Sequence, residues 1–83
     1  MKYSFIIPIY NRPDELDELL QSLTAQQYND DFEVVVVDDG SPQPLEAICL
    51  RYPLMDISYY RKANTGPGDS RNYGMQRAKH DYF

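Results

Sequence analysis

Two adjacent aspartates, Asp38 and Asp39, follow the apolar run "VVVV" and precede a glycine and a serine. An ionised carboxylate only accepts hydrogen bonds, whereas the guanidinium of Arg71 offers a planar fork of donors. Tyr10 adds an aromatic face on which a flat base can stack. A carboxylate facing a ring N–H, an arginine facing a carbonyl and a stacked tyrosine would together recognise a uracil-like base.

Each of these residues also has an interpretation in the fold alone. Tyr10 would serve as part of the core, and Asp–Asp before Gly–Ser is typical of a turn followed by a helix cap. Neighbouring strand residues point to opposite sides of a sheet, so we expect one aspartate to face a ligand and the other to brace a loop. The segment 64–66 is typical of a turn. Backbone N–H groups of Gly66 and Gly68 could bind phosphate, although no complete glycine-rich motif is present.

Three segments predict the β-strands that must position these side chains. Residues 3–9 form an apolar run with Pro8 near its end, where a missing N–H is tolerated. The uninterrupted β-branched run in 32–39 is typical of a parallel sheet covered on both faces. Residues 56–62 alternate, which favours a position nearer the edge of the sheet. Residues 81–83 are expected to open a fourth strand.

The first connecting segment carries the strongest helix signal. Asn11 is a plausible N-cap for a helix that reaches residue 27, with Pro13 in its first turn. Four leucines follow at helical spacing and form one apolar stripe, at positions 16, 19, 20 and 23.

Two further helices are predicted later in the chain. Ser41 is expected to cap a helix that begins at Pro42 and ends before Pro53. Residues 63–70 predict a loop, and 70–80 predict a weaker helix because it contains Gly74.

The alternation of strands and helices predicts an α/β fold with a doubly wound, mainly parallel sheet and flanking helices. In such sheets, ligands bind beyond the carboxyl ends of the strands. We therefore expect the segments "PIYNR", "DDGS" and "GPGDSRN" to converge at that edge.

Composition limits the function classes. The chain has 83 residues, 42% of them hydrophobic, and a formal net charge of −5, which argues against nucleic acid as a partner. Its single cysteine, Cys49, favours a reducing compartment and a buried apolar role for that side chain. The longest apolar run is too short to cross a membrane, so we expect a cytoplasmic location, with membrane association only in a longer protein. No metal-ligand spacing is evident.

Taken together, "FIIPIYNRPDELDELLQSLTAQ", "EVVVVDDGSP" and "NTGPGDSRNYGMQRAKHDYF" resemble the N-terminal part of glycosyltransferase family 2, which has the GT-A fold. The resemblance covers nearly the whole chain, with three motifs in the right order and spacing. It implies an inverting, hexosyltransferase-like transfer of a sugar from a nucleotide diphosphate sugar, commonly a UDP-sugar, to an unknown acceptor. Polysaccharide biosynthesis is the process that it suggests.

The resemblance also assigns the nucleotide-binding residues by their match to the family's motifs. Pro8 and Tyr10 belong to the end of the first nucleotide-binding strand. Asp39 would hydrogen-bond the base, Asp38 precedes it in the same motif, and Arg71 would approach the base or ribose. The remaining member, Asn72, follows Arg71 in the family's Arg–Asn pair and would mainly hold the loop.

The sequence departs from the family pattern in two respects. Ser70 stands where many members have alanine. The Asp-x-Asp motif that holds the divalent metal, Mg or Mn, does not occur in the 83 residues, and neither a catalytic residue nor a metal ligand is assigned. We therefore interpret residues 1–83 as a single partial domain, the nucleotide-sugar-binding half of a glycosyltransferase truncated near the fourth strand, which alone would be inactive. Without that strand, the first strand would be an exposed edge that favours self-association.

Three alternatives remain. The first is a non-catalytic module that binds a nucleotide without turnover. The second is a phospho-receiver domain, but this class needs a further aspartate after a later strand, where the chain has Arg61 and Lys62. The third is a dinucleotide-binding domain, which would need Gly-x-Gly-x-x-Gly where this chain has "YNRPDE".

Overall fold

The computed structural model describes residues 3–25 and 32–79. Its elements are, in order, β1 (Tyr3–Ile9), α1 (Pro13–Ala25), β2 (Phe32–Asp38), α2 (Glu46–Cys49), β3 (Ile57–Arg61) and α3 (Pro67–Arg77). The three strands pair in the order β1-β2-β3, and both pairs are parallel. The predicted α/β class is therefore confirmed, and the three strands predicted within the described residues are present to within one residue at either end.

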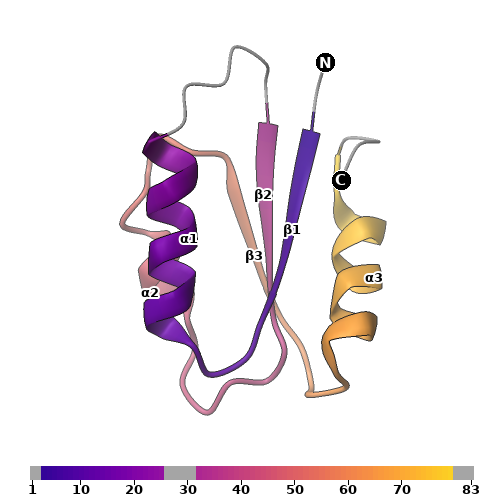
Figure 1. Cartoon of the computed structure of the whole chain (residues 1–83). Helices are drawn as coiled ribbons and strands as arrows, with labels where there is room; N and C mark the ends of the chain where they lie inside the picture. The colour runs from indigo at the N-terminus through magenta and orange to yellow at the C-terminus, as the bar shows by residue number, and fades with distance from the viewer. Residues whose placement is uncertain (1–2, 26–31, 80–83) are drawn as a thin grey trace.

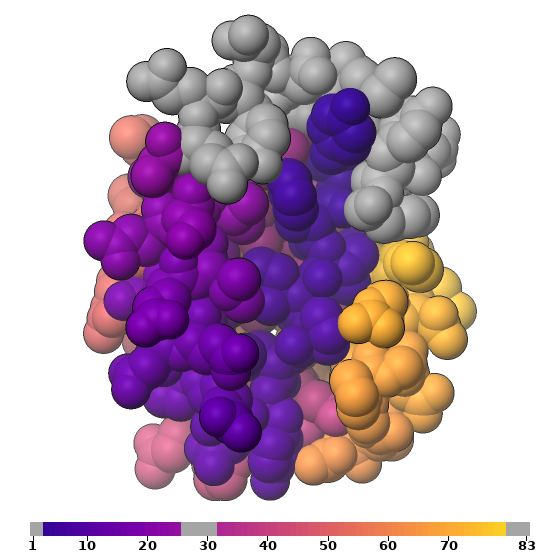
Figure 2. Space-filling view, in the orientation of Figure 1, coloured from indigo at the N-terminus to yellow at the C-terminus, as the bar shows by residue number. Residues whose placement is uncertain are grey.

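The elements form three layers. Helices α1 and α2 cover one face of the sheet, and α3 covers the other (Figure 1). In the space-filling view, β1 is visible between α1 and α3, with the two helices on either side of it (Figure 2). All three strands run in the same direction, so their carboxyl ends lie together at the lower edge in Figure 1.

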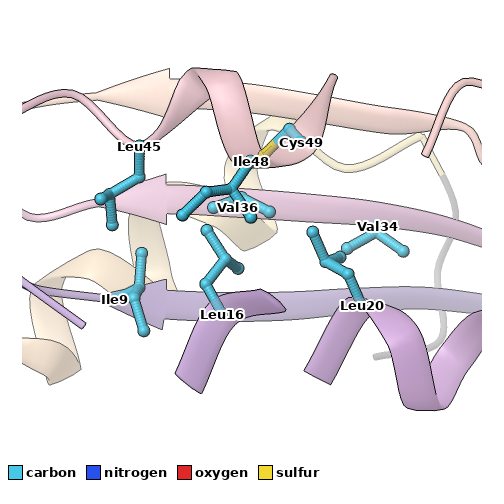
Figure 3. Packing of buried hydrophobic residues seen from close by; sticks show 8 residues of the cluster. All are labelled: Ile9, Leu16, Leu20, Val34, Val36, Leu45, Ile48 and Cys49. Atoms are coloured by element: carbon cyan, nitrogen blue, oxygen red, sulfur yellow. The ribbon is translucent and has the colours of Figure 1, made fainter. Parts of the chain in front are cut away.

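The larger core lies between the sheet and the helices α1 and α2. Val34 and Val36 face Leu16 and Leu20 of α1, and α2 contributes Ile48 to the same cluster (Figure 3). The alternate residues Val35 and Val37 are also fully buried. A strand buried on both faces explains why four consecutive valines stand in β2, because neither face can accept a polar side chain without cost.

The other face of the sheet is covered at very short range by α3. A Cβ placed on Gly74 would lie 2.6 Å from Cγ2 of Ile6 and 3.1 Å from Cγ2 of Val37. The glycine that weakened the helix prediction is thus the residue that lets α3 approach β1 and β2.

The predicted cap of α1 is wrong. Asn11 has φ +50° and lies outside the helix, and the first helical bond runs from the Leu16 amide to the Arg12 carbonyl, at 3.0 Å. The left-handed region is one that asparagine tolerates better than most residues, which makes it suited to the sharp turn before Pro13.

The predicted start of α2 is also wrong, because the helix begins four residues after Pro42 and spans only Glu46–Cys49. Pro44 disfavours helical backbone at the residue before it, and the side chain and amide of Ser41 are used elsewhere. Helix α3 instead begins earlier than predicted, with Pro67 in its first turn, where a missing N–H costs nothing.

The described residues bear differently on the predicted fourth strand and on the question of a membrane span. The fourth strand at 81–83 lies outside the described residues, so self-association through 4–9 stays a prediction. Within 3–25 and 32–79, no helix has both the length and the apolarity that crossing a membrane requires.

Candidate nucleotide-binding site

The register of the sheet places its last residues in one row. Ile9 pairs with Asp38, and Asp38 pairs with Arg61. The ladder continues one step further, because the Asp39 amide donates to the Ile9 carbonyl at 2.8 Å and the Lys62 amide donates to the Asp38 carbonyl at 3.0 Å. The predicted convergence of the strand ends at one edge is thus present.

Asp38 is fully buried and braces the segment that leads to α2. Its carboxylate accepts from the Ser41 amide at 2.9 Å, from the Leu45 amide at 3.4 Å and from the Tyr59 hydroxyl. Burial alone would raise the pKa of Asp38, but these donors outweigh it and hold the pKa below its usual value. The same burial and the bond to Asp38 raise the pKa of Tyr59 to about 12, so the phenol remains a donor.

Ser41 joins the end of β2 to the turn after β1. Its hydroxyl oxygen accepts from the Asn11 amide at 2.7 Å, and its carbonyl accepts from Nη2 of Arg61 at 2.6 Å. Arg61 also approaches Asp38, with 3.9 Å between Nε and Oδ2. Buried polar groups of this kind hold the loop at the ends of all three strands in one geometry.

Asp39 braces a different loop, the one that connects β3 to α3. Its Oδ1 accepts from Nζ of Lys62 at 2.6 Å and from the Thr65 amide at 2.9 Å, and its Oδ2 accepts from the Gly66 amide at 2.9 Å. Burial would raise the pKa of Asp39, but Lys62 and the two amides outweigh it and lower the pKa to about 2. The carboxylate is therefore ionised and accepts only.

One acceptor position of Asp39 remains open among the described residues. A carboxylate offers about four lone-pair positions, and three donors leave one on Oδ2. The expectation that one aspartate braces a loop and the other faces a ligand is thus incomplete, because both brace loops.

Of the other four predicted residues, Pro8 and Tyr10 lie at the carboxyl end of β1, and Arg71 and Asn72 lie in the N-terminal half of α3. Tyr10 is 45% exposed, so it does not serve as core. Arg71 and Asn72 lie in α3 and are exposed, and neither side chain bonds to another described residue. The prediction that Asn72 holds the loop therefore finds no contact in this part of the chain. Pro8 is half-buried in β1, opposite Val37.

An open cleft of about 550 Å³ adjoins the ion pair of Asp39 and Lys62. Its described lining consists of Gly40 and the segment 61–64, so none of the six predicted residues lines it. Gly40 has φ +77°, and a Cβ there would lie 2.9 Å from the Asn64 amide nitrogen, which makes the two loops mutually dependent.

Sequence reasoning missed Lys62 as a member of this site. Its side chain is 11% exposed and pairs with Asp39, whose side chain is 6% exposed. The sequence did contain a signal for this contact. If the ends of the second and third predicted strands are aligned in parallel, "DD" lies opposite "RK". A basic pair opposite an acidic pair at the same edge predicts ion pairs across the sheet.

The described residues do not fit the divalent cation that the family resemblance implies. No group of three or more histidine, cysteine, aspartate or glutamate side chains lies close enough among them to hold a metal. Asp38 and Asp39 turn to different sets of protein donors rather than toward a shared point. Cys49 lies in the hydrophobic core cluster, and burial raises the pKa of its thiol to about 11, in agreement with the predicted apolar role.

Comparison with known proteins identifies the family. The sequence model of glycosyl transferase family 2 matches residues 4–83. An uncharacterized glycosyltransferase of Rickettsia typhi is 41% identical over 80 residues, covering 96% of this chain and 24% of the relative. The chondroitin synthase of Pasteurella multocida is 43% identical over 82 residues, covering 95% of this chain and 8% of the synthase.

A solved structure agrees with these matches. The crystal structure of Staphylococcus aureus TarS 1–349 superposes with a TM-score of 0.84 at 37% identity, covering 95% of this chain and 25% of TarS. The chain belongs to glycosyl transferase family 2 and has the GT-A fold. It spans a quarter or less of each of these relatives.

Proposed function

We propose that this edge of the sheet binds the nucleotide of a nucleotide diphosphate sugar, with uracil as the base. The chain would be the donor-binding part of a glycosyltransferase that moves the sugar to an acceptor with inversion. The observation that carries this proposal is the state of Asp39: ionised, fixed by three protein donors and with one acceptor position open on Oδ2.

The neighbouring side chains supply what else such a base would need. Arg71 has no partner among the described residues, so its donors are available for a base carbonyl or a ribose oxygen. Tyr10 presents an exposed ring at the end of β1. The divalent metal, and the acid or base chemistry of transfer, are assigned to residues that these 83 do not include.

The relatives favour a polymer as the product of the reaction. The named relatives include the chondroitin synthase, a hyaluronan synthase of Pasteurella multocida and a poly(ribitol-phosphate) β-N-acetylglucosaminyltransferase, TarS. We accordingly place the chain in polysaccharide biosynthesis. The alternative, a module that binds the nucleotide without turnover, makes the same binding prediction and differs only in releasing no product.

Titration calorimetry with UDP tests the binding. The Asp39→Asn variant replaces the charged carboxylate that would accept the ring N–H of the base with a neutral amide. We therefore expect its dissociation constant for UDP to rise about 10-fold or more. Asp56→Asn is the matched control, because Asp56 is an exposed carboxylate beside the amino end of β3 that pairs with Lys79. Equal affinities for all three proteins, or no binding of UDP at millimolar concentration, would contradict the proposal.

A further inference from the structure

Lys62 is the one cation in direct contact with Asp39 among the described residues. It follows β3 directly, and its ammonium lies 2.6 Å from Oδ1 of Asp39. The ammonium has two further acceptors in the same loop, the Ala63 carbonyl at 2.9 Å and the Thr65 hydroxyl. An ammonium has three protons, so these three acceptors use all of its donors.

This saturation separates Lys62 from a phosphate-binding lysine. A lysine that binds an anion keeps at least one donor free, and its head is usually well hydrated. Here the head is nearly buried and turned toward its own loop. The ammonium of Lys62 therefore has no donor left for a ligand, and its charge acts on one through the carboxylate that it holds.

The contacts of Asp39 make that influence specific. Oδ1 is filled by Lys62 and the Thr65 amide, so an incoming N–H can be accepted only at the open position of Oδ2. We propose that Lys62 is a positioning residue that selects a base with a ring N–H by holding Oδ1 of the ionised Asp39, which leaves the unfilled acceptor position on Oδ2. This inference rests on the proposed function and deepens it.

The selection has a chemical consequence. An ionised carboxylate attracts a ring N–H and repels a ring nitrogen that carries a lone pair, so uracil is accepted and cytosine is rejected. Without Lys62, Oδ1 loses its strongest partner and the carboxylate is free to rotate. The preference for a base with a ring N–H over a base without one should then fall more than the overall affinity for the nucleotide does.

The test compares UDP with its N3-methyl derivative, which lacks the ring proton. We expect the unaltered chain to bind UDP about 10- to 100-fold more tightly than the N3-methyl derivative. This is the factor that one hydrogen bond to a charged group contributes to affinity. In Lys62→Met we expect that ratio to fall to about threefold or less. Lys79→Met is the matched control, because Lys79 also pairs with an aspartate, Asp56, at 3.0 Å but beyond the far end of α3, and it should keep the ratio.

The outcomes separate the two proposals. If the unaltered chain binds both ligands equally, the proposed role of Asp39 fails. If it discriminates, and Lys62→Met binds both ligands more weakly with the same ratio, the role of Lys62 is overturned while that of Asp39 stands. Should Lys62→Met not fold, as judged by circular dichroism, Thr65→Val removes one acceptor of the ammonium and replaces it in the test. A lowered ratio supports the positioning role, and an unchanged ratio overturns it.

Discussion

Asp38 and Asp39 are neighbours in the chain, yet their carboxylates brace different loops. Asp38 accepts from the segment that leads to α2, and Asp39 accepts from the loop that leads to α3. The period of two along a strand sends the two side chains to opposite faces of the sheet. One dipeptide thereby holds two of the three connections at the carboxyl edge, and the two aspartates are not equivalent.

Acid should destabilise the chain through these two residues. A carboxylate whose pKa is lower in the folded than in the unfolded state stabilises the fold fully above its unfolded value, and this contribution is lost as the pH falls. For Asp39 the loss spans the range from the ordinary 3.8 down to about 2, and Asp38 acts in the same direction. Urea unfolding between pH 6 and pH 2 should show a shallower decline for Asp39→Asn than for the unaltered chain. Parallel declines would contradict the assigned pKa.

Gly74→Ala should destabilise the fold. The added methyl would lie 2.6 Å from Cγ2 of Ile6, closer than real Cβ atoms come, and a tight 3.1 Å from Cγ2 of Val37. Such overpacking costs about 1–3 kcal/mol. Alanine regains up to about 1 kcal/mol of helix propensity, so the net effect is a loss. Gly68→Ala, where nothing lies within 4 Å of the new methyl, should be neutral or stabilising. Thermal unfolding of the two variants checks the contrast, and equal melting temperatures would refute the close approach of α3.

Tyr59→Phe should lower the free energy of unfolding by about 1–3 kcal/mol, because it removes a donor from the buried carboxylate of Asp38. The Leu45 amide, 3.0 Å from the Tyr59 oxygen, loses its better partner at the same time. Tyr60→Phe is the control, since Tyr60 contributes its ring to contacts with Tyr73 and Arg77. Chemical denaturation that places both variants at the same stability would count against the Asp38 network.

Cys49 should react slowly with thiol reagents in the folded chain. Its side chain is buried, and the raised pKa leaves almost no thiolate at neutral pH. Timed reaction with a disulfide reagent at pH 7 should be complete only after urea is added. Rapid reaction without urea would mean that α2 does not pack as described.

The strands could be predicted from the sequence because their signal is hydrophobic burial, which acts on the whole run of residues. Four consecutive valines are typical of a strand that is covered on both faces. The helix caps could not be predicted in the same way. Ser41 has the right side chain for a cap, but its hydroxyl is taken by Asn11 from a segment thirty residues earlier. A competing partner of this kind is visible only in three dimensions.

The candidate site shows the same contrast between residues with a local sequence signal and residues set by tertiary contacts. Tyr10 and Asp39 were predicted from their place directly after strands, and the parallel register does bring the ends of those strands to one edge. Arg71 lies within α3, and its part in the site stays a prediction. Lys62 was missed because a lysine at a strand end is ordinarily solvated. Its burial follows from the parallel register, which no local pattern contains.

Asp39 is the proposed acceptor for the ring N–H of the base. The amides of Thr65 and Gly66 donate directly to its carboxylate, so their ¹⁵N–¹H signals report any new partner that it acquires. On titration with UDP, we expect both signals to shift together with that of Tyr10, and we expect no such shifts in Asp39→Asn. Shifts confined to other parts of the chain, or shifts at Thr65 and Gly66 that persist in Asp39→Asn, would contradict the proposed site.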